Sequence, residues 1–217
     1  MQDTATLLNS INHFAKNTQG HDYIVGDIHG CFTKLQEALD KIPFNPEVDR
    51  LFSVGDLVDR GPESELAMDW LAKPWFHAVR GNHDQMAIDA VKGFYEPSNY
   101  LANGGAWFLG LPDDHRRLFA DLFNILPLWI EVETDNGLVG IVHGDGPADW
   151  QHVDKINPHW LLWGRVRISR KDTTEVKNVY RVYCGHTPVE EELIYGNTHF
   201  IDTGAVFGRE FTIVRIQ

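Results

Sequence analysis

The sequence predicts an α/β (α+β) protein in which two mixed β-sheets form a sandwich flanked by helices. Three observations support this class. Short apolar runs rich in β-branched and aromatic residues end abruptly in Gly-Asp, Gly-Asn or His-Gly. Helical patterns separate several of these runs in the first half of the chain. From about residue 127 the pattern becomes mostly strand-like, so two sheets with helices outside them fit both halves.

Each strand is expected at a short apolar run. Five buried strands that end at a polar residue are expected over 23–25, 51–54, 76–79, 139–142 and 182–184. The strand-like segments of the second half cover 128–133, 138–142, 180–184 and 211–216.

Helices are expected between the early strands, because apolar residues recur there at helical spacing. These stretches are 32–42, 66–71 and 86–91, and Pro62 marks the start of the second. The first half therefore predicts a βαβα order with a parallel sheet, and the second half a mostly β region with short helices.

Composition limits the partners. The chain has 217 residues and a formal net charge of −12, with 31 acidic and 19 basic side chains. This charge argues against a nucleic-acid partner, because a phosphate backbone attracts clustered Lys and Arg. No Pro/Gly/Ser linker or repeat divides the sequence. A lead-in over residues 1–20, with no assigned role, and a single domain over 21–217 are expected.

Location is predicted from what the sequence lacks. It has no apolar signal-peptide core and no run of roughly 20 apolar residues, so a cytoplasmic protein without a membrane partner is expected. Cys31 and Cys184 form no CxxC pair and are expected to be reduced packing residues. The sequence leaves the oligomeric state open.

Metal-capable side chains follow five of the expected strands, where ligands of open α/β sheets bind. They are Asp27 with His29, then Asp56, Asn82, His143 and His186. This set contains carboxylates, an amide and imidazoles but no thiolate, which suits Mn, Fe or Zn rather than a structural zinc site. With one carboxylate shared, six ligands can hold two ions about 3.5–4 Å apart, as in two-metal hydrolytic sites.

Taken singly, each residue has an ordinary explanation. Asp27 could cap a helix, and Asn82 in Gly-Asn is a common turn residue. Seven further histidines lack the strand-end setting and are expected to be surface or packing residues: His13, His21, His77, His115, His152, His159 and His199. The ordered combination of motifs is what favours a metal site.

Three of these motifs have a specific order. GDIHG (26–30), GDLVDRGP (55–62) and GNHD (81–84) resemble the signature of the phosphoprotein phosphatase branch of the calcineurin-like metallophosphatases. VHGD (142–145), GHTP (185–188) and IDTGAVFG (201–208) are similar to the compact bacterial and lambda-phage serine/threonine phosphatases. The resemblance runs from about residue 21 to the C-terminus and implies the calcineurin-like sandwich of two mixed sheets.

The resemblance implies a role for each matching residue. It implies that Asp27 and His29 bind one metal, that Asn82, His143 and His186 bind the other, and that Asp56 bridges both. His83 matches the proton donor, and Asp59 the carboxylate that orients it. Arg60 matches a phosphate-binding arginine, and Arg165 in Trp-Gly-Arg resembles the second one, on a shorter motif.

The implied reaction is hydrolysis of phosphoserine or phosphothreonine in proteins, with phosphotyrosine as a further option. A hydroxide bridging two divalent ions, expected to be Mn²⁺ with Fe or Zn as alternatives, would attack phosphorus in line. The leaving alkoxide is a strong base, so His83 would protonate it. The partners are then phosphorylated proteins.

Two other functions compete with this one. A bis(5'-nucleosyl)-tetraphosphatase shares the fold and metals, but such enzymes typically have Ala where Asp59 stands; Asp84, in contrast, matches them. An enzyme with Ala at position 59 would lack the acid pair, and this difference is more important than the match at Asp84. Asp59 therefore favours the phosphatase. A non-catalytic metal-binding interaction protein is the remote alternative. Trp75, Phe76 and Trp107 could line a substrate groove, and a core position is preferred for them.

Overall fold

One of the two sheets is four-stranded and carries the first half of the chain. The structure, a computed structural model, describes residues 12–217. The strand order is β10 (Ile213–Arg215), β2 (Asp22–Val25), β3 (Arg50–Ser53) and β4 (Phe76–Ala78). The last three run parallel, as predicted, and β10 joins β2 antiparallel.

The second sheet is six-stranded and mixed. Its order is β1 (His13–Phe14), β5 (Trp129–Thr134), β6 (Gly137–Val142), β7 (Arg181–Cys184), β9 (Thr198–Phe200) and β8 (Leu193–Tyr195). β5 pairs antiparallel with β6, whereas β6, β7 and β9 run parallel. β1 adds a parallel edge strand from the region to which the sequence assigned no role.

The two sheets pack face to face over a shared apolar core. Ile24 and Phe52 of the four-stranded sheet share one buried cluster with Ile130, Ile141 and Tyr183 of the six-stranded sheet. Because strand side chains alternate between faces, the neighbouring residues of the same strands point to the outer faces, which helices cover. The predicted sandwich is therefore confirmed.

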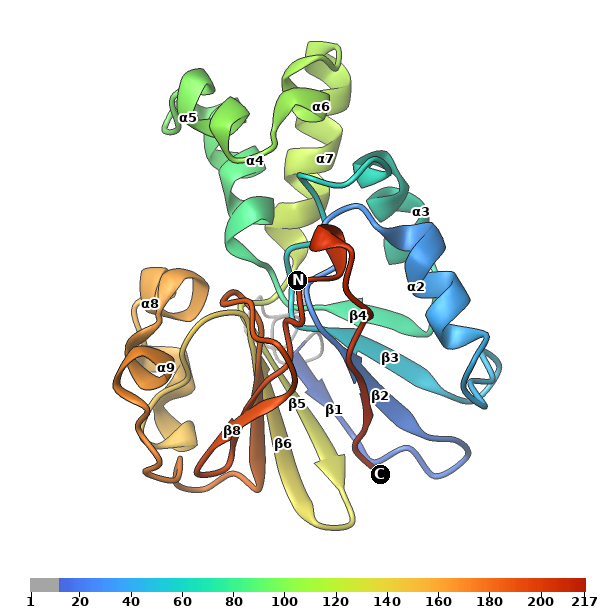
Figure 1. Ribbon diagram of the computed structural model, residues 1–217, viewed down its shortest axis with the longest axis vertical. Helices are drawn as coiled ribbons and strands as arrows, with labels where there is room; N and C mark the ends of the chain where they lie inside the picture. The colour runs from blue at the N-terminus through green and yellow to red at the C-terminus, as the bar shows by residue number, and fades with distance from the viewer. Residues whose placement is uncertain (1–11) are drawn as a thin grey trace, which may run out of the picture.

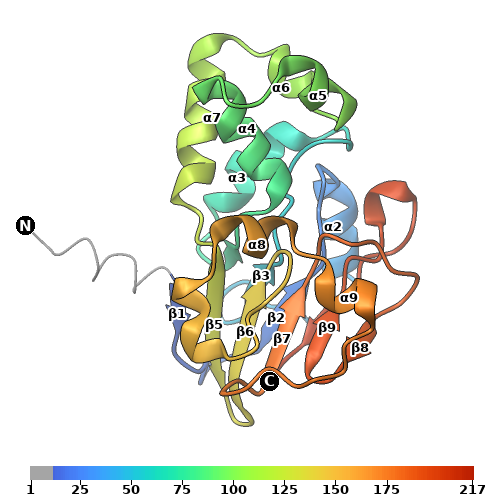
Figure 2. The same ribbon diagram turned by 90° about the vertical axis from the view of Figure 1, so that its left-hand side faces the viewer.

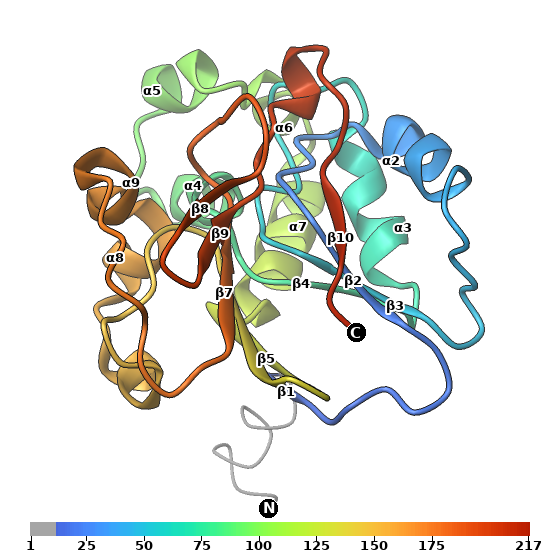
Figure 3. The same ribbon diagram turned by 60° about the horizontal axis from the view of Figure 1, so that its bottom comes forward.

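Helices cover both outer faces of the sandwich (Figure 3). On the four-stranded sheet lie α2 (Phe32–Leu39) and α3 (Ala67–Leu71), and on the six-stranded sheet α8 (Pro158–Trp163) and α9 (Val166–Arg170) with the 3₁₀ turn η2 (Trp150–Lys155). The predicted start of the second helix at Pro62 is wrong. A 3₁₀ turn, η1 (Ser64–Leu66), comes first, and the α-helix starts at Ala67.

A group of four helices projects beyond one end of the sandwich (Figures 1 and 2). It consists of α4 (Asn82–Lys92), α5 (Pro97–Ala102), α6 (Ala106–Leu109) and α7 (Asp113–Ile125). The sequence predicted only the first, over 86–91, and Val91 at the end of that stretch is exposed. Tyr100 and Phe108 form the core of this group with Phe119 and Phe123. A short 3₁₀ turn, η3 (Ala205–Phe207), lies near the C-terminus.

Two smaller findings complete the fold. No helix among residues 12–217 is both long and apolar enough to cross a membrane. Cys31 and Cys184 are free thiols, half-buried and buried respectively. Burial raises the pKa of the Cys184 thiol, which accords with a packing role.

Candidate active site

The six predicted metal ligands gather where strands of both sheets end. Each follows a parallel strand: β2 is followed by Asp27 and His29, β3 by Asp56, β4 by Asn82, β6 by His143, and β7 by His186. Parallel strands place their carboxyl ends at one edge of a sheet, and the two sheets present these edges to each other. All six side chains are at most 6% exposed, so their donor atoms lie below the protein surface.

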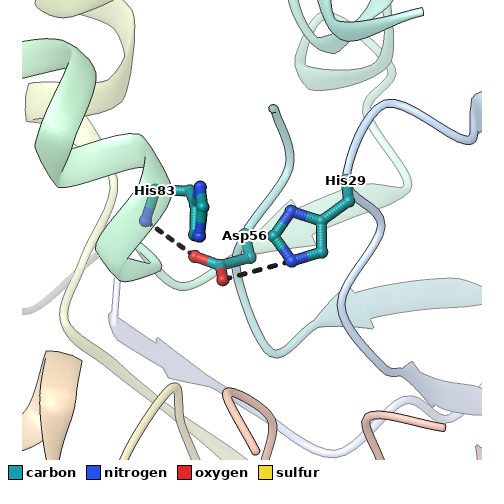
Figure 4. Close-up of side chains that lie close together, drawn as sticks. All are labelled: His29, Asp56 and His83. Carbon is teal, nitrogen blue, oxygen red and sulfur yellow. Dashed lines mark hydrogen bonds and ion pairs between the residues drawn. The ribbon is translucent and has the colours of Figure 1, made fainter. Parts of the chain in front are cut away.

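Asp56 is shared by two groups of ligand-capable atoms. In the first, atoms of His29, Asp56 and His83 lie within 4.8 Å of one another; in the second, so do atoms of Asp56, His143 and His186. His29 Nε2 lies 3.5 Å from Asp56 Oδ2, and His143 Nε2 lies 3.3 Å from Asp56 Oδ1 (Figure 4 shows the first group). A carboxylate with one oxygen toward each group is placed to bridge two cations.

The remaining two ligands border these groups. Asn82 Oδ1 lies 2.8 Å from His143 Nε2, so the amide belongs beside the second group. Asp27 falls in neither group; its two carboxylate oxygens accept the backbone N–H of His186 at 3.2 and 3.1 Å. The structure thus brings all six residues together, with Asp27 at the side of His186 and with His83 inside the first group.

Strained backbone supports the site. His29, Asp56, Asp59, Arg60 and His186 have φ values of 45°, 50°, 72°, 68° and 68°, in the left-handed region that side chains with a Cβ rarely adopt. Such conformations cost about 1–3 kcal/mol each and persist where surrounding structure holds them. Their concentration here indicates a site at which side-chain direction is more important than local stability.

Two glycines allow the loops to approach closely. A Cβ at position 81 would lie 2.1 Å from Asp56 N, and a Cβ at position 185 would lie 2.0 Å from Asp27 Oδ1. Only glycine fits at either place.

The electrostatics of the site fit bound divalent cations. Burial raises the pKa of Asp27, and the carboxylates of Asp202 and Asp56 raise it further. Burial also lowers the pKa of His29 and of His186 to about 3, so both imidazoles are neutral and have a lone pair for a metal. Clustered carboxylates with neutral imidazoles lack positive charge of their own, and two divalent ions would supply it.

The charge of Asp56 is favoured by its neighbours. Burial by itself raises its pKa, but His143, His83 and His29 together with the His83 N–H bring the net value below the usual range. The shared carboxylate therefore remains ionised, as a bridging ligand must.

A buried hydrogen-bonded pair, His83 and Asp59, lies beside the candidate ligands. His83 Nδ1 lies 2.8 Å from Asp59 Oδ2, and both residues are at most 1% exposed. Asp59 Oδ1 accepts Tyr100 Oη–H at 3.1 Å and Trp107 Nε1–H at 2.7 Å. Trp107 packs against the core with Trp75 and Phe76, as preferred from the sequence, and it also holds the carboxylate of the pair.

Two exposed arginines border the same ligands. Arg60 Nη1 donates to His29 Nε2 at 2.6 Å, and Arg165 Nη2 donates to the carbonyl oxygen of His186 at 3.4 Å. Both residues are exposed and border the site on its solvent side.

Three residues of this site were not assigned from the sequence. Asp202 is 3% exposed, and its carboxylate influences Asp27. It follows β9 at a strand end in IDTG, so the strand-end pattern could have identified it. Tyr100 and Trp107 come from α5 and α6, which the sequence did not predict.

Known proteins resemble this chain over most of its length. A family model described as calcineurin-like phosphoesterase matches residues 23–206. Serine/threonine-protein phosphatase 1 of Salmonella typhimurium is 42% identical over 207 residues, which cover 94% of each chain. Bis(5'-nucleosyl)-tetraphosphatase PrpE of Geobacillus thermodenitrificans is 34% identical over 226 residues, with 90% of each chain covered. In fold, the chain matches the crystal structure of a provisionally assigned diadenosine tetraphosphatase with a TM-score of 0.67 and 22% identity, covering 95% of this chain and 94% of that one.

Proposed function

This chain belongs to the calcineurin-like phosphoesterase family, and from that premise we propose that it is a metal-dependent protein phosphatase acting on phosphoserine and phosphothreonine. The buried pair of His83 and Asp59 carries the proposal. A seryl or threonyl alkoxide leaves only with a proton, and this pair can supply one. The 42% identity to a serine/threonine-protein phosphatase supports the same substrate class.

The six clustered residues are proposed as the ligands of two ions. We assign Asp27 and His29 to one ion, Asn82, His143 and His186 to the other, and Asp56 to both. Their oxygen and imidazole donors suit Mn²⁺, with Fe or Zn as alternatives. When bound, such ions offset phosphate charge and lower the pKa of coordinated water to about 7.

The acid pair acts at the leaving group. Asp59 accepts the Nδ1–H of His83, which leaves Nε2 of the same ring as the proton donor. Tyr100 and Trp107 hold the other carboxylate oxygen, so Asp59 cannot turn away from the ring. A positioned acid of this kind contributes about 10²–10⁴-fold to the rate.

Arg60 and Arg165 are proposed to bind the phosphate. Their guanidinium groups each offer a planar pair of donors for phosphate oxygens. Within residues 12–217 the guanidinium of Arg60 hydrogen-bonds only to His29, and the residue is exposed, so it can turn from His29 toward a substrate.

A dinucleoside tetraphosphatase is the second candidate, favoured by Asp84 and by the relative of that name. Asp84, however, is fully buried, and its oxygens accept the backbone N–H groups of Leu57 and Gly81. This residue cannot reach a substrate, so it says little about which phosphate ester is cleaved. The phosphatase remains the better supported function, with phosphorylated proteins as its partners. The single domain proposed over 21–217 gains one edge strand, β1, from the residues before it.

Parallel hydrolysis assays test the choice. Chelator-stripped protein is reloaded with Mn²⁺, Zn²⁺ or Fe²⁺ and given a phosphoserine/phosphothreonine peptide or diadenosine tetraphosphate. We expect metal-dependent phosphate release from the peptide, with the dinucleotide spared. In parallel, His83→Asn should keep the metals and lose kcat on the peptide, whereas the exposed control His115→Asn should change neither. Preferential cleavage of the dinucleotide would assign the chain to the second candidate, and full activity of His83→Asn would refute the acid assignment.

A further inference from the structure

A buried carboxylate connects the segment that carries His143 with the segment that carries Arg165. Asp145 comes two residues after His143 at the end of β6 and is 2% exposed. Its Oδ2 accepts the backbone N–H of Val166 at 2.5 Å and that of Arg167 at 3.2 Å. These two residues directly follow Arg165, so the carboxylate holds the backbone from which that side chain extends.

The same strand end fixes the chain on the other side of Arg165. Gly144 N donates to the carbonyl oxygen of Leu161 at 2.6 Å. A Cβ at position 164 would lie 2.6 Å from Asp145 Cβ, so Gly164 is pressed against this carboxylate. The Trp-Gly-Arg segment is thus attached to β6 on both sides of the arginine.

Arg165 itself has little else to orient it. Its only side-chain hydrogen bond within residues 12–217 is the 3.4 Å contact with the His186 carbonyl oxygen, and it forms no ion pair there. The helix that follows, α9, has five residues, too few to hold its own direction. The direction of the guanidinium therefore depends on where the backbone is anchored.

We propose that Asp145 is a positioning residue that acts through Arg165 to hold its guanidinium at the phosphate site. This rests on the proposed function, in which Arg165 binds phosphate. Removing the carboxylate would release the backbone after Arg165. The arginine would still be present, but its guanidinium would no longer be held in one direction. A mobile arginine loses more entropy when it binds, so phosphate binding should weaken.

A double-mutant cycle tests the coupling in the Mn²⁺-loaded protein. Asp145→Ala, Arg165→Ala and the double variant are compared by kcat/KM on the phosphopeptide and by the Kd of inorganic phosphate in calorimetry. Arg165→Ala should weaken both by roughly 10–100-fold, as for loss of a charge-assisted hydrogen bond. Asp145→Ala should reproduce most of that loss. In the Arg165→Ala background it should cost less than about 2-fold, because coupled residues are non-additive.

Matched variants separate positioning from general damage. Asp172→Ala removes an exposed carboxylate that bonds Thr174 N beyond α9, and it should leave both measurements unchanged. Asp145→Asn keeps one acceptor oxygen and should restore part of the activity; if Asp145→Ala does not fold, this variant replaces it in the cycle.

Several outcomes would overturn the proposal. The losses from Asp145 and Arg165 could multiply, Asp145→Ala could retain full phosphate affinity, or it could lose bound Mn²⁺, which would place its effect on His143. Failure of the proposed function would give a different result. The wild-type protein would release no phosphate from the peptide, while the double-mutant cycle could still be measured by phosphate binding.

Discussion

Asp59 is the residue on which the proposed acid chemistry depends. Its buried carboxylate bonds His83 through one oxygen and Tyr100 and Trp107 through the other. An acceptor on this side leaves the proton on Nδ1 of the histidine, and a negative charge there stabilises the imidazolium that acts as the acid. The bond to Asp59 thereby distinguishes His83, the proposed acid, from the proposed metal ligands, although His83 lies among them.

Asp59→Asn should lower kcat while the metals remain. An amide can donate to His83 Nδ1 and so favour the tautomer with the proton on Nε2, which is a poor acid. We expect a loss of about 10²–10³-fold on a phosphoserine peptide, and a much smaller loss on an aryl phosphate, whose leaving group needs no proton. Metal content is measured alongside. The surface pair of Asp114 and His115 supplies a control, since Asp114→Asn should do nothing. Equal losses on both substrates would exclude a role at the leaving group.

His77 predicts a pH dependence of stability. Burial, and secondarily Arg50, lowers its pKa from 6.5 to about 4, and the ring packs on Phe14 and Phe52. Between pH 6.5 and 4 the unfolded chain binds the proton and the folded chain resists it, so stability falls as the pH falls through this window. Above pH 6.5 the contribution vanishes.

His77→Phe should remove that part of the acid loss. The expected difference in unfolding free energy between pH 7 and pH 4 is about 1–3 kcal/mol, measured by urea unfolding of both proteins in chelator. Exposed His115→Phe should follow the wild-type profile. Identical pH profiles for wild type and His77→Phe would contradict the assignment.

At this scale the sequence identified much of the site. The six proposed ligands and the proposed acid pair lie in short motifs whose order is informative, so their positions along the chain were enough to select the residues that the structure brings together. Tyr100 and Trp107 lie 41 and 48 residues from Asp59 and reach it only through tertiary packing. No local pattern marks such contacts. Asp202 was identifiable from its strand end and was left unassigned.

Among the elements, the start of α4 both carries residues of the candidate site and connects them to the loop after β3. Asn82 and His83 occupy its first turn, and His83 N donates to Asp56 Oδ1 at 2.9 Å. Asp84, two positions into the helix, accepts Gly81 N and Leu57 N, at 2.8 and 3.0 Å, and so ties the helix to the loop after β3. The start of α4 therefore fixes the positions of Asp56, Asn82 and His83 relative to one another.

Asp84→Ala should destabilise the protein without changing its substrate preference. Two buried N–H groups would lose their acceptor, at about 1–3 kcal/mol each. The unfolding free energy is measured with urea. Asp89→Ala, later on the same helix, is the control, because within residues 12–217 the Asp89 carboxylate bonds only the Gln85 side chain. The ratio of peptide to dinucleotide hydrolysis should stay constant. A changed ratio would mean that Asp84 influences the substrate after all.

The projecting helices show where sequence reading of elements failed. The α7 helix has the expected signals, with Pro112 before it and Asp113 and Asp114 in its first turn. The α5 and α6 helices are too short for apolar residues to recur at helical spacing, so the sequence gives no helical pattern there. Strands were easier, because each ends at a glycine next to a polar residue. β1, β8 and β9 have two or three residues and were missed, whereas β4 and β10, which are equally short, lie in the longer apolar stretches 76–79 and 211–216 and were predicted.

For the whole molecule, the site joins the two sheets. Asp27, Asp56 and Asn82 follow strands of the four-stranded sheet, whereas His143 and His186 follow strands of the six-stranded sheet. Ions held by both sets would oppose separation of the sheets. They would also relieve the repulsion that raises the pKa of Asp27.

Metal removal should therefore lower the melting temperature. Free Mn²⁺ at 100 times its Kd should stabilise the folded state by about 2.7 kcal/mol, which chelator reverses. Asp56→Asn should lose most of this response, because its carboxylate faces both groups, while apo Asp56→Asn should melt no lower than apo wild type. Calorimetric melting curves with and without Mn²⁺ test both points, with Asp114→Asn as control. A wild-type melting temperature that ignores both Mn²⁺ and chelator would refute the proposed metal centre.

A chain emerging from a ribosome presents Asp27 and Asp56 long before His186. With the proposed ligands, the early segment offers mainly oxygen donors, and two of the three imidazoles come only from the later half. A nascent chain that has reached only Asn82 would thus offer an incomplete donor set, made mainly of oxygen atoms, which selects poorly among divalent ions. The finished donor set exists only once residue 186 has joined the sheet. Discrimination between metals is consequently a property of the completed protein, exercised after synthesis by exchange with the surrounding pool.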